Sequence, residues 1–411
     1  MASLLKFSNE ILLEIASFLV YHEPSPLTQH VGFDGWVNEI QLRNILAFRL
    51  FTRDLKSLSY TCRRLHRVTS VLLYAQIPLL YRDDRKTEAL IETLDNHQDL
   101  TSLLKIVHVN VERFHDPPID FHSLFFLPNI QELSIKGCNA WDGWDGDKAA
   151  RVGTSSVQVL RLLKCGAHET PLTEMLSWPR NLKELWYDVE QGEWDGHYEG
   201  DEATGFSCTA VARAMSSLVG SLEKFVFSRP PLDHEGLGYS TLLNLRSFEK
   251  LKSLWIYHVF LVAWESEEAK VWEHFPRSLE ELDVFYDDHD CVTLFGDDAP
   301  TPNWLFGLLD RIKEGQDFTP SLRRIRLSSD ESIREVEDYS DDEDERFDGK
   351  DFHLIPGFDE ARGYIGNNYT WRPPRMLVEK FISANVSFTI GVDQGPRYVY
   401  VVEGGQGFED D

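Results

Sequence analysis

The segment IQELSIKGC, residues 130–138, decides how this chain folds. Its apolar residues Ile130, Leu133 and Ile135 follow the spacing Leu-x-x-Leu-x-Leu. Side chains alternate between the two faces of a β-strand, so the last two of these anchors lie on the same face. The segment therefore predicts a short strand that buries one of its faces.

The same spacing occurs in eight copies along the chain. The middle anchors lie at positions 107, 133, 160, 185, 225, 254, 282 and 325, and five of the seven intervals between them are 25–29 residues long. Helical patterns lie between the copies, two of them after the N-cap candidates Thr170 and Asn303 and one at residues 208–219. Alternating strands and helices predict an α/β fold with parallel strands and outer helices. At a period of about 26 residues, such units stack into a solenoid.

The repeated motif resembles the leucine-rich repeat, whose consensus continues to a buried Asn or Cys. Two copies reach Cys138 and Cys165 at that place, where the resemblance implies a small polar group that meets turn backbone groups inside the core. The other copies depart from the consensus, so the repeats are irregular. The resemblance covers about residues 100–330, and we expect the solenoid to occupy residues 81–330. The departing residues are Glu190, Pro230, Val259, Asp287 and Asp330.

Residues 1–80 precede the repeats and predict a small helical module. In FSNEILLEIASFL, residues 7–19, the apolar residues form one helical stripe after Ser8 or Asn9 as N-cap. In DLKSLSYTCRRLHRV, residues 54–68, the spacing of Leu55, Leu58, Cys62 and Leu65 predicts a second helix. A third short apolar segment is SVLLYAQIPL, residues 70–79. One interpretation of this module is that it covers the end of the solenoid, whose core must be shielded from water.

The module resembles the F-box over about 45 positions. Two departures are Phe7 in place of the family Leu and Ser8 in place of the following Pro, and a third is an insertion at about residues 20–53. An F-box before leucine-rich repeats resembles the substrate receptors of cullin–RING (SCF-type) ubiquitin ligases. The resemblance implies that the module binds the Skp adaptor subunit, and through it a cullin, while the repeats bind a target protein. The implied adaptor-binding residues are Phe7, Ser8, Ile11, Leu12, Ile15, Leu19, Leu55, Leu58, Cys62 and Leu65.

The charge of the chain differs between the module and the rest. The formal net charge is −27, and residues 1–86 contribute 11 basic and 8 acidic residues, which leaves 30 basic and 60 acidic residues elsewhere. A body this acidic is a poor partner for nucleic acid and for anionic membranes. It favours a basic target protein, or serves solubility alone. The basic residues of the second helix either meet acidic groups of the adaptor or form a solvated face.

Several segments outside the repeats carry distinctive composition. Loops rich in aromatic and acidic residues contain Trp141, Trp144, Trp194 and Tyr198, which we expect either to bind the target or to fold back on the repeat core. Their carboxylates do not follow the EF-hand spacing, so no metal site is expected. The acidic stretch 330–351 predicts a disordered loop, and its Ser340 resembles an acid-directed kinase site. Residues 352–411, with the strand patterns VSFTIGV and RYVYVV, predict a C-terminal capping segment and tail.

Patterns typical of enzymes and exported proteins are missing from the sequence. It has no GxSxG, HExxH or P-loop motif, and the tripeptide at 289–291, His-Asp-Cys, lacks further support as a catalytic pair. Five widely spaced Cys without CxxC fit a reducing compartment and no zinc site. No signal-peptide pattern is present, and no apolar run approaches the roughly 20 residues of a membrane span. These absences predict a cytoplasmic or nuclear protein without a cofactor, and the F-box and leucine-rich-repeat resemblances imply that it is a non-catalytic substrate receptor. The alternatives are an interaction scaffold with no ubiquitin link and, third, an enzyme.

Overall fold

The structure is a computed structural model of the chain, and its described residues fall into two units, one up to residue 192 and one from residue 193. Each unit is treated by itself. The described residues are 6–17, 53–80, 92–94, 96–110, 121–137, 139–140, 149–167, 169–189, 208–228, 243–262, 270–286, 303–315, 321–330, 375–393 and 399–404.

The first unit begins with a small helical module. It contains α1 (Asn9–Ser17), a helix at residues 53–59, and α3 (Arg63–Leu73). Ser8 caps α1 as predicted, because its side-chain oxygen accepts a hydrogen bond from the Ile11 amide at 3.4 Å. Leu12, Leu65 and Val68 form the core of this module, and partly buried apolar side chains pack around them.

The prediction of one helix across residues 54–68 is wrong. The helix at 53–59 ends in a turn, and Cys62 has an extended backbone (φ −163°, ψ 162°) before α3 begins. Around the break, Ser59 and Thr61 donate hydroxyl hydrogen bonds to the carbonyl oxygens of Lys56 and Leu58. Ser and Thr hydroxyls that bond to nearby backbone carbonyls compete with the hydrogen bonds that would continue a helix. The apolar stripe expected on one helix is therefore divided between two helices.

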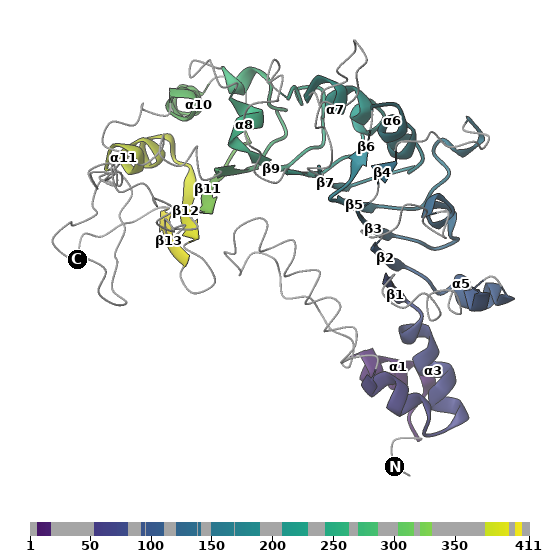
Figure 1. Cartoon of the computed structure of the whole chain (residues 1–411). Helices are drawn as coiled ribbons and strands as arrows, with labels where there is room; N and C mark the ends of the chain where they lie inside the picture. Colours follow the sequence, from purple (N-terminus) through teal and green to yellow (C-terminus); the bar gives the residue numbers. More distant parts are fainter. Residues whose placement is uncertain are drawn as a thin grey trace, which may run out of the picture. The chain divides into compact units, whose positions relative to one another are not determined.

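Five parallel strands follow the module in the first unit, side by side and in chain order (Figure 1). The backbone register aligns Val107, Leu133, Leu160 and Leu185, the predicted middle anchors of four copies. The strands are β1 (Gln76–Leu80), β2 (Ile106–Asn110), β3 (Glu132–Lys136), β5 (Val159–Leu163) and β7 (Glu184–Asp188).

Strand β1 lies within the range that the sequence assigned to the helical module. It pairs with β2 so that Ile77 faces Val107, and Ile77 is buried like the other anchors. Immediately before β1, the carbonyl oxygen of Ala75 accepts hydrogen bonds from the amides of Lys105 and Ile106. The repeat sheet therefore begins at Gln76, directly after α3.

The remaining described elements of the first unit lie between these strands. A second, small sheet pairs β4 with β6 in parallel. The elements are α5 (Gln98–Thr101), η3 (Phe121–Phe126), β4 (Asn139–Ala140), η4 (Ala149–Arg151), β6 (Gly166–Ala167) and α6 (Glu169–Ser177).

The second unit repeats the same alternation. Its strands β8, β9, β10, β11 and β12 pair in parallel, and β13 pairs antiparallel to β12. The strands are β8 (Lys224–Ser228), β9 (Ser253–Tyr257), β10 (Glu281–Tyr286), β11 (Arg324–Asp330), β12 (Ser387–Asp393) and β13 (Val399–Gly404). The helical elements are α7 (Cys208–Ala214), η5 (Met215–Leu218), α8 (His258–Leu261), η7 (Val271–Glu273), α10 (Asn303–Lys313) and α11 (Arg375–Ala384).

The C-terminal segment continues the repeat. Both predicted strands are present, and β12 aligns Phe388 with the anchor Ile325 of β11. Helix α11, which the sequence analysis missed, precedes β12 and buries Leu377 and Phe381. In Figure 1, α11 lies beside α10. Residues 375–393 therefore form one more helix–strand unit of the repeat.

The predicted anchors are buried in the core of both units, together with apolar side chains from the helices and loops between the strands. Every anchor of the eight copies is at most 5% exposed, including Leu104, Ile130 and Leu322 at first positions. Burial of one such side chain contributes roughly 1.5–3 kcal/mol, so each row of anchors makes a large contribution to the stability of the repeats. Cys165 is also buried, and its thiol lies 3.3 Å from the carbonyl oxygen of Leu163 and 3.5 Å from that of Ile135. A small polar group inside the core therefore meets backbone groups, as expected.

Candidate functional site

Each repeat strand has a second face, opposite the anchors, which we call the polar face. The residue between the last two anchors of a copy points to this face, because side chains alternate along a strand. In the parallel register these residues form one row across the strands of each unit. The row consists of His108, Ser134, Arg161 and Trp186 in the first unit, and of Val226, Trp255, Asp283, Arg326 and Thr389 in the second.

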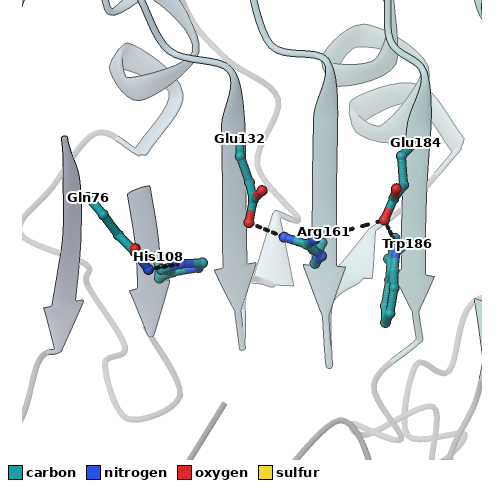
Figure 2. Close-up of polar contacts among 6 residues, drawn as sticks. All are labelled: Gln76, His108, Glu132, Arg161, Glu184 and Trp186. Carbon is teal, nitrogen blue, oxygen red and sulfur yellow. Dashed lines mark hydrogen bonds and ion pairs between the residues drawn. The ribbon is translucent and has the colours of Figure 1, made fainter. Parts of the chain in front are cut away.

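An ion-pair ladder crosses three strands on the polar face of the first unit (Figure 2). Arg161 on β5 bonds Glu132 on β3, and its second terminal nitrogen lies 3.8 Å from Glu184 Oε1 on β7. The same Glu184 oxygen accepts a hydrogen bond from the indole Nε1 of Trp186, and the Arg161 guanidinium lies 5.3 Å from the centre of a Trp186 ring. These charged groups therefore satisfy one another across the three strands.

His108 lies beside this ladder and is half-buried. Its Nε2 is 3.2 Å from Nε2 of Gln76 on β1 (Figure 2). Burial lowers the pKa of His108 from 6.5 to about 4; Glu132 acts against this shift and Arg161 adds to it. The imidazole is therefore neutral near pH 7, and its Nε2 can accept a hydrogen bond from the Gln76 amide nitrogen.

The polar face of the second unit holds a less complete set of partners. Arg324 on β11 contacts Glu281 on β10 at 2.6 Å, whereas the next pair along the same strands, Arg326 and Asp283, is 3.6 Å apart. Asp283 is only 5% exposed. Burial raises the pKa of Asp283 from 3.8 to about 6, although Arg326, Arg324 and the nearby Lys224 act against the shift. Burial therefore disfavours the ionised form of this carboxyl in the folded chain.

Trp255 lies next to that carboxyl on β9. The Lys224 ammonium and the Arg326 guanidinium are each 5.7 Å from the centre of a Trp255 ring. Cations held on an aromatic ring are favourable contacts worth about 0.5–1 kcal/mol when partly exposed. The indole thus positions two cationic groups around Asp283.

The predicted adaptor-binding residues divide into two groups in the structure. Leu12, Leu55 and Leu65 are buried within the first unit. Leu58 and Cys62 are half-buried and pack against the module core. The exposed members are Phe7, Ser8, Ile11 and Ile15; the three apolar ones are 44%, 42% and 38% exposed, respectively. Among the described members of this set, the apolar side chains exposed to solvent are therefore Phe7, Ile11 and Ile15.

Arg64 on α3 has a role that the sequence did not indicate. Its Nε donates to the Asn9 side chain at 2.8 Å, and its Nη2 donates to the Phe7 carbonyl oxygen at 2.6 Å. One of the basic residues of the second predicted helix thus fixes the start of α1, rather than forming only a solvated face.

Some predicted residues lie outside the described part of the chain. They are Leu19, Cys138, Trp141, Trp144, Trp194, Tyr198, the tripeptide at 289–291, and Ser340 with the acidic stretch from residue 331. The polar face was missed by the sequence analysis. A signal was available, because the residue between the last two anchors of each copy must point away from the core.

The described residues contain no group of three or more His, Cys, Asp or Glu side chains placed to hold a metal ion. Within the same residues, no helix is long and apolar enough to cross a membrane. The polar face provides charged and hydrogen-bonding groups along strands, an arrangement suited to binding an extended partner by complementary polar contacts.

Comparisons with known proteins give no family for this chain. No family model matches it, and no curated protein matches it. Among solved structures, it is similar to a crystal structure of a protein from Bacteroides fragilis, a structural-genomics target, with 15% sequence identity and a TM-score of 0.31. That match covers 62% of this chain and 60% of the Bacteroides chain.

Proposed function

We propose that this protein is a non-catalytic substrate receptor of an SCF-type cullin–RING ubiquitin ligase. In this proposal the N-terminal helical module acts as an F-box that binds the Skp adaptor, and the repeats, of leucine-rich type, bind a target protein. Catalysis of ubiquitin transfer belongs to other subunits. The F-box and leucine-rich-repeat resemblances of the sequence motivate the proposal.

The observation that carries the proposal is the exposed apolar stripe at the start of the chain. Ile11 and Ile15 are four residues apart in α1, so they share one side of the helix, and Phe7 is exposed just before the Ser8 cap. Leu12, their neighbour in sequence, points instead into the core with Leu65. An apolar stripe that the module's own core leaves exposed is the kind of surface that a partner helix covers.

A second function is favoured by a different observation. Helix α3 leads directly into β1, and the carbonyl oxygen of Ala75 between them bonds the amides of Lys105 and Ile106. A module joined this closely to the first strand suits an end cap of a repeat scaffold with no link to ubiquitin. In that case the exposed stripe has no adaptor to bind.

Co-purification with a Skp adaptor distinguishes the two functions. The informative variant combines Ile11→Glu with Ile15→Glu, and Tyr60→Glu is a matched control because Tyr60 is an exposed aromatic residue of the same module, 84% exposed. Since Ile11 and Ile15 are exposed, the charged variant should keep its fold, as judged by circular dichroism.

The receptor function predicts that wild type and Tyr60→Glu bind the adaptor and that the double variant does not. A wild-type chain that fails to bind, or a double variant that binds as well as wild type, would contradict the adaptor role. Either result would leave the repeat scaffold as the better description.

A further inference from the structure

Asp283 is a buried acidic residue that the second unit does not satisfy. Its neighbours Leu282 and Val284 are fully buried anchors, so alternation places the Asp283 side chain on the polar face. Neither carboxylate oxygen accepts a hydrogen bond from any residue that the structure describes. Among the described residues, the nearest cationic atom is Arg326 Nη1, at 3.6 Å from Oδ2, which is too long for a hydrogen bond.

Hydrogen-bond donors next to Asp283 are also unsatisfied. Within the described residues, the buried Nε atoms of Arg324 and Arg326 have no acceptor. The register aligns Asp283 with Arg326 on the adjacent strand β11, and Glu281 with Arg324. Adjacent strands are about 4.8 Å apart, so the Asp283 carboxylate, which lacks donors, lies close to the arginine Nε atoms, which lack an acceptor. Buried polar groups are normally paired, and this combination points to a ligand that supplies both kinds of partner.

The charges around the site select the chemistry of that ligand. Facing Asp283 are Lys224 on β8, Glu281 on its own strand, and Arg324 and Arg326 on β11. With Asp283 included, there are three positive and two negative groups. A cationic ligand would be repelled by the three positive groups, and an anionic ligand would be repelled by the two carboxylates. A neutral carboxamide avoids both conflicts, because its NH₂ donates to a carboxylate while its oxygen accepts from a guanidinium.

We propose that Asp283 and Arg326 form a recognition site for a carboxamide, namely an Asn or Gln side chain carried by an extended segment of a target protein. Asp283 accepts from the amide nitrogen, and Arg326 donates to the amide oxygen. Trp255 holds the Lys224 and Arg326 side chains beside the site. The overall acidity of the chain favours a basic target, but the charges at this site favour a neutral group. This inference deepens the target-binding part of the proposed function and is independent of adaptor binding.

The test uses the full chain and a phage-displayed library of random twelve-residue peptides, selected at pH 7.5. We expect enrichment of Asn or Gln at one position of the selected peptides. A synthetic selected peptide is then measured by fluorescence anisotropy against protein variants. Asp283→Asn should weaken binding by about tenfold, because the Asn oxygen still accepts the hydrogen bond but lacks the charge that strengthens it. Ser134→Ala, in the corresponding row of the first unit, should bind as wild type does.

Two further substitutions, one in the protein and one in the peptide, distinguish a loss of binding from a loss of folding. Arg326→Lys keeps the positive charge but removes the Nε donor, and it should also weaken binding of the peptide. In the peptide, replacement of the selected Asn by Asp, or Gln by Glu, should abolish binding although the size of the side chain hardly changes. Circular dichroism spectra of both protein variants should match wild type.

The proposal is overturned if no peptide is selected, if selected peptides lack a fixed Asn or Gln, or if Asp283→Asn binds them like wild type. Adaptor co-purification separates this outcome from failure of the proposed function. Peptide binding without adaptor binding contradicts the ubiquitin-ligase role and supports the carboxamide site. Adaptor binding without peptide binding contradicts the carboxamide site alone.

Discussion

Replacement of Asp283 by Asn should stabilise the protein at neutral pH. Burial raises the pKa of Asp283 from 3.8 to about 6 in the folded chain. The difference of about 2 in pKa corresponds to about 3 kcal/mol at 1.36 kcal/mol for each pKa unit. That is the cost of keeping the ionised carboxylate in the fold at pH 7. Asn has nearly the same shape without the charge, so Asp283→Asn should raise the free energy of unfolding by up to about 3 kcal/mol.

The sign of the pH dependence follows from the raised pKa. Between about pH 4 and pH 6 the folded chain binds a proton at Asp283 that the unfolded chain does not, so wild type gains stability as the pH falls through this range. The Asn variant lacks this contribution. The advantage of Asp283→Asn should therefore be largest above pH 6 and should shrink toward zero near pH 4.

Guanidinium unfolding at several pH values, followed by tryptophan fluorescence, measures this difference. The comparison of the two proteins at each pH cancels the titration of the many other carboxylates. Glu281→Gln is a suitable control, because Glu281 is partly exposed and bonded to Arg324, so its removal should not stabilise the fold. If Asp283→Asn destabilises the protein at pH 7, or if its effect is the same at pH 4 and pH 7, the interpretation of Asp283 as an unsatisfied buried charge is wrong.

Three further predictions concern packing and titration. Gly307→Ala should lower the free energy of unfolding by roughly 1–3 kcal/mol, because the new methyl group would lie 2.6 Å from the Trp272 ring. Gly220→Ala is the control and should be nearly neutral, because the space around Gly220 is open. Equal effects of the two substitutions would contradict this packing. Leu133→Ala should lower the free energy of unfolding by about 2–5 kcal/mol, because this fully buried anchor lies in the middle of a row. A decrease below about 1 kcal/mol would show that the repeat core tolerates cavities. NMR titration of His108 should give a midpoint near pH 4, since burial lowers its pKa, and a midpoint above 6 would place it in water.

The helical module shows where a local pattern misleads. The spacing of Leu55, Leu58, Cys62 and Leu65 is that of one continuous helix, and Leu55 and Leu65 are indeed buried. The backbone nevertheless breaks at Cys62, because a turn between two short helices can keep the same side chains on the inside. The pattern thus identified the residues that face inward but not the path of the backbone between them.

The sequence by itself determined the strands of the eight copies and which of their side chains face the core. Leu-x-x-Leu-x-Leu spacing is a local property, and burial of anchors two residues apart leaves one choice of inward face, so the spacing alone places all eight copies. The polar face depends on tertiary structure. Trp255, Asp283 and Arg326 are separated by 28 and 43 residues, and only the parallel register of β9, β10 and β11 makes them neighbours. Whether a carboxylate is satisfied or left without donors depends on such cross-strand neighbours, because hydrogen bonds act over about 3 Å, a distance that sequence spacing does not encode.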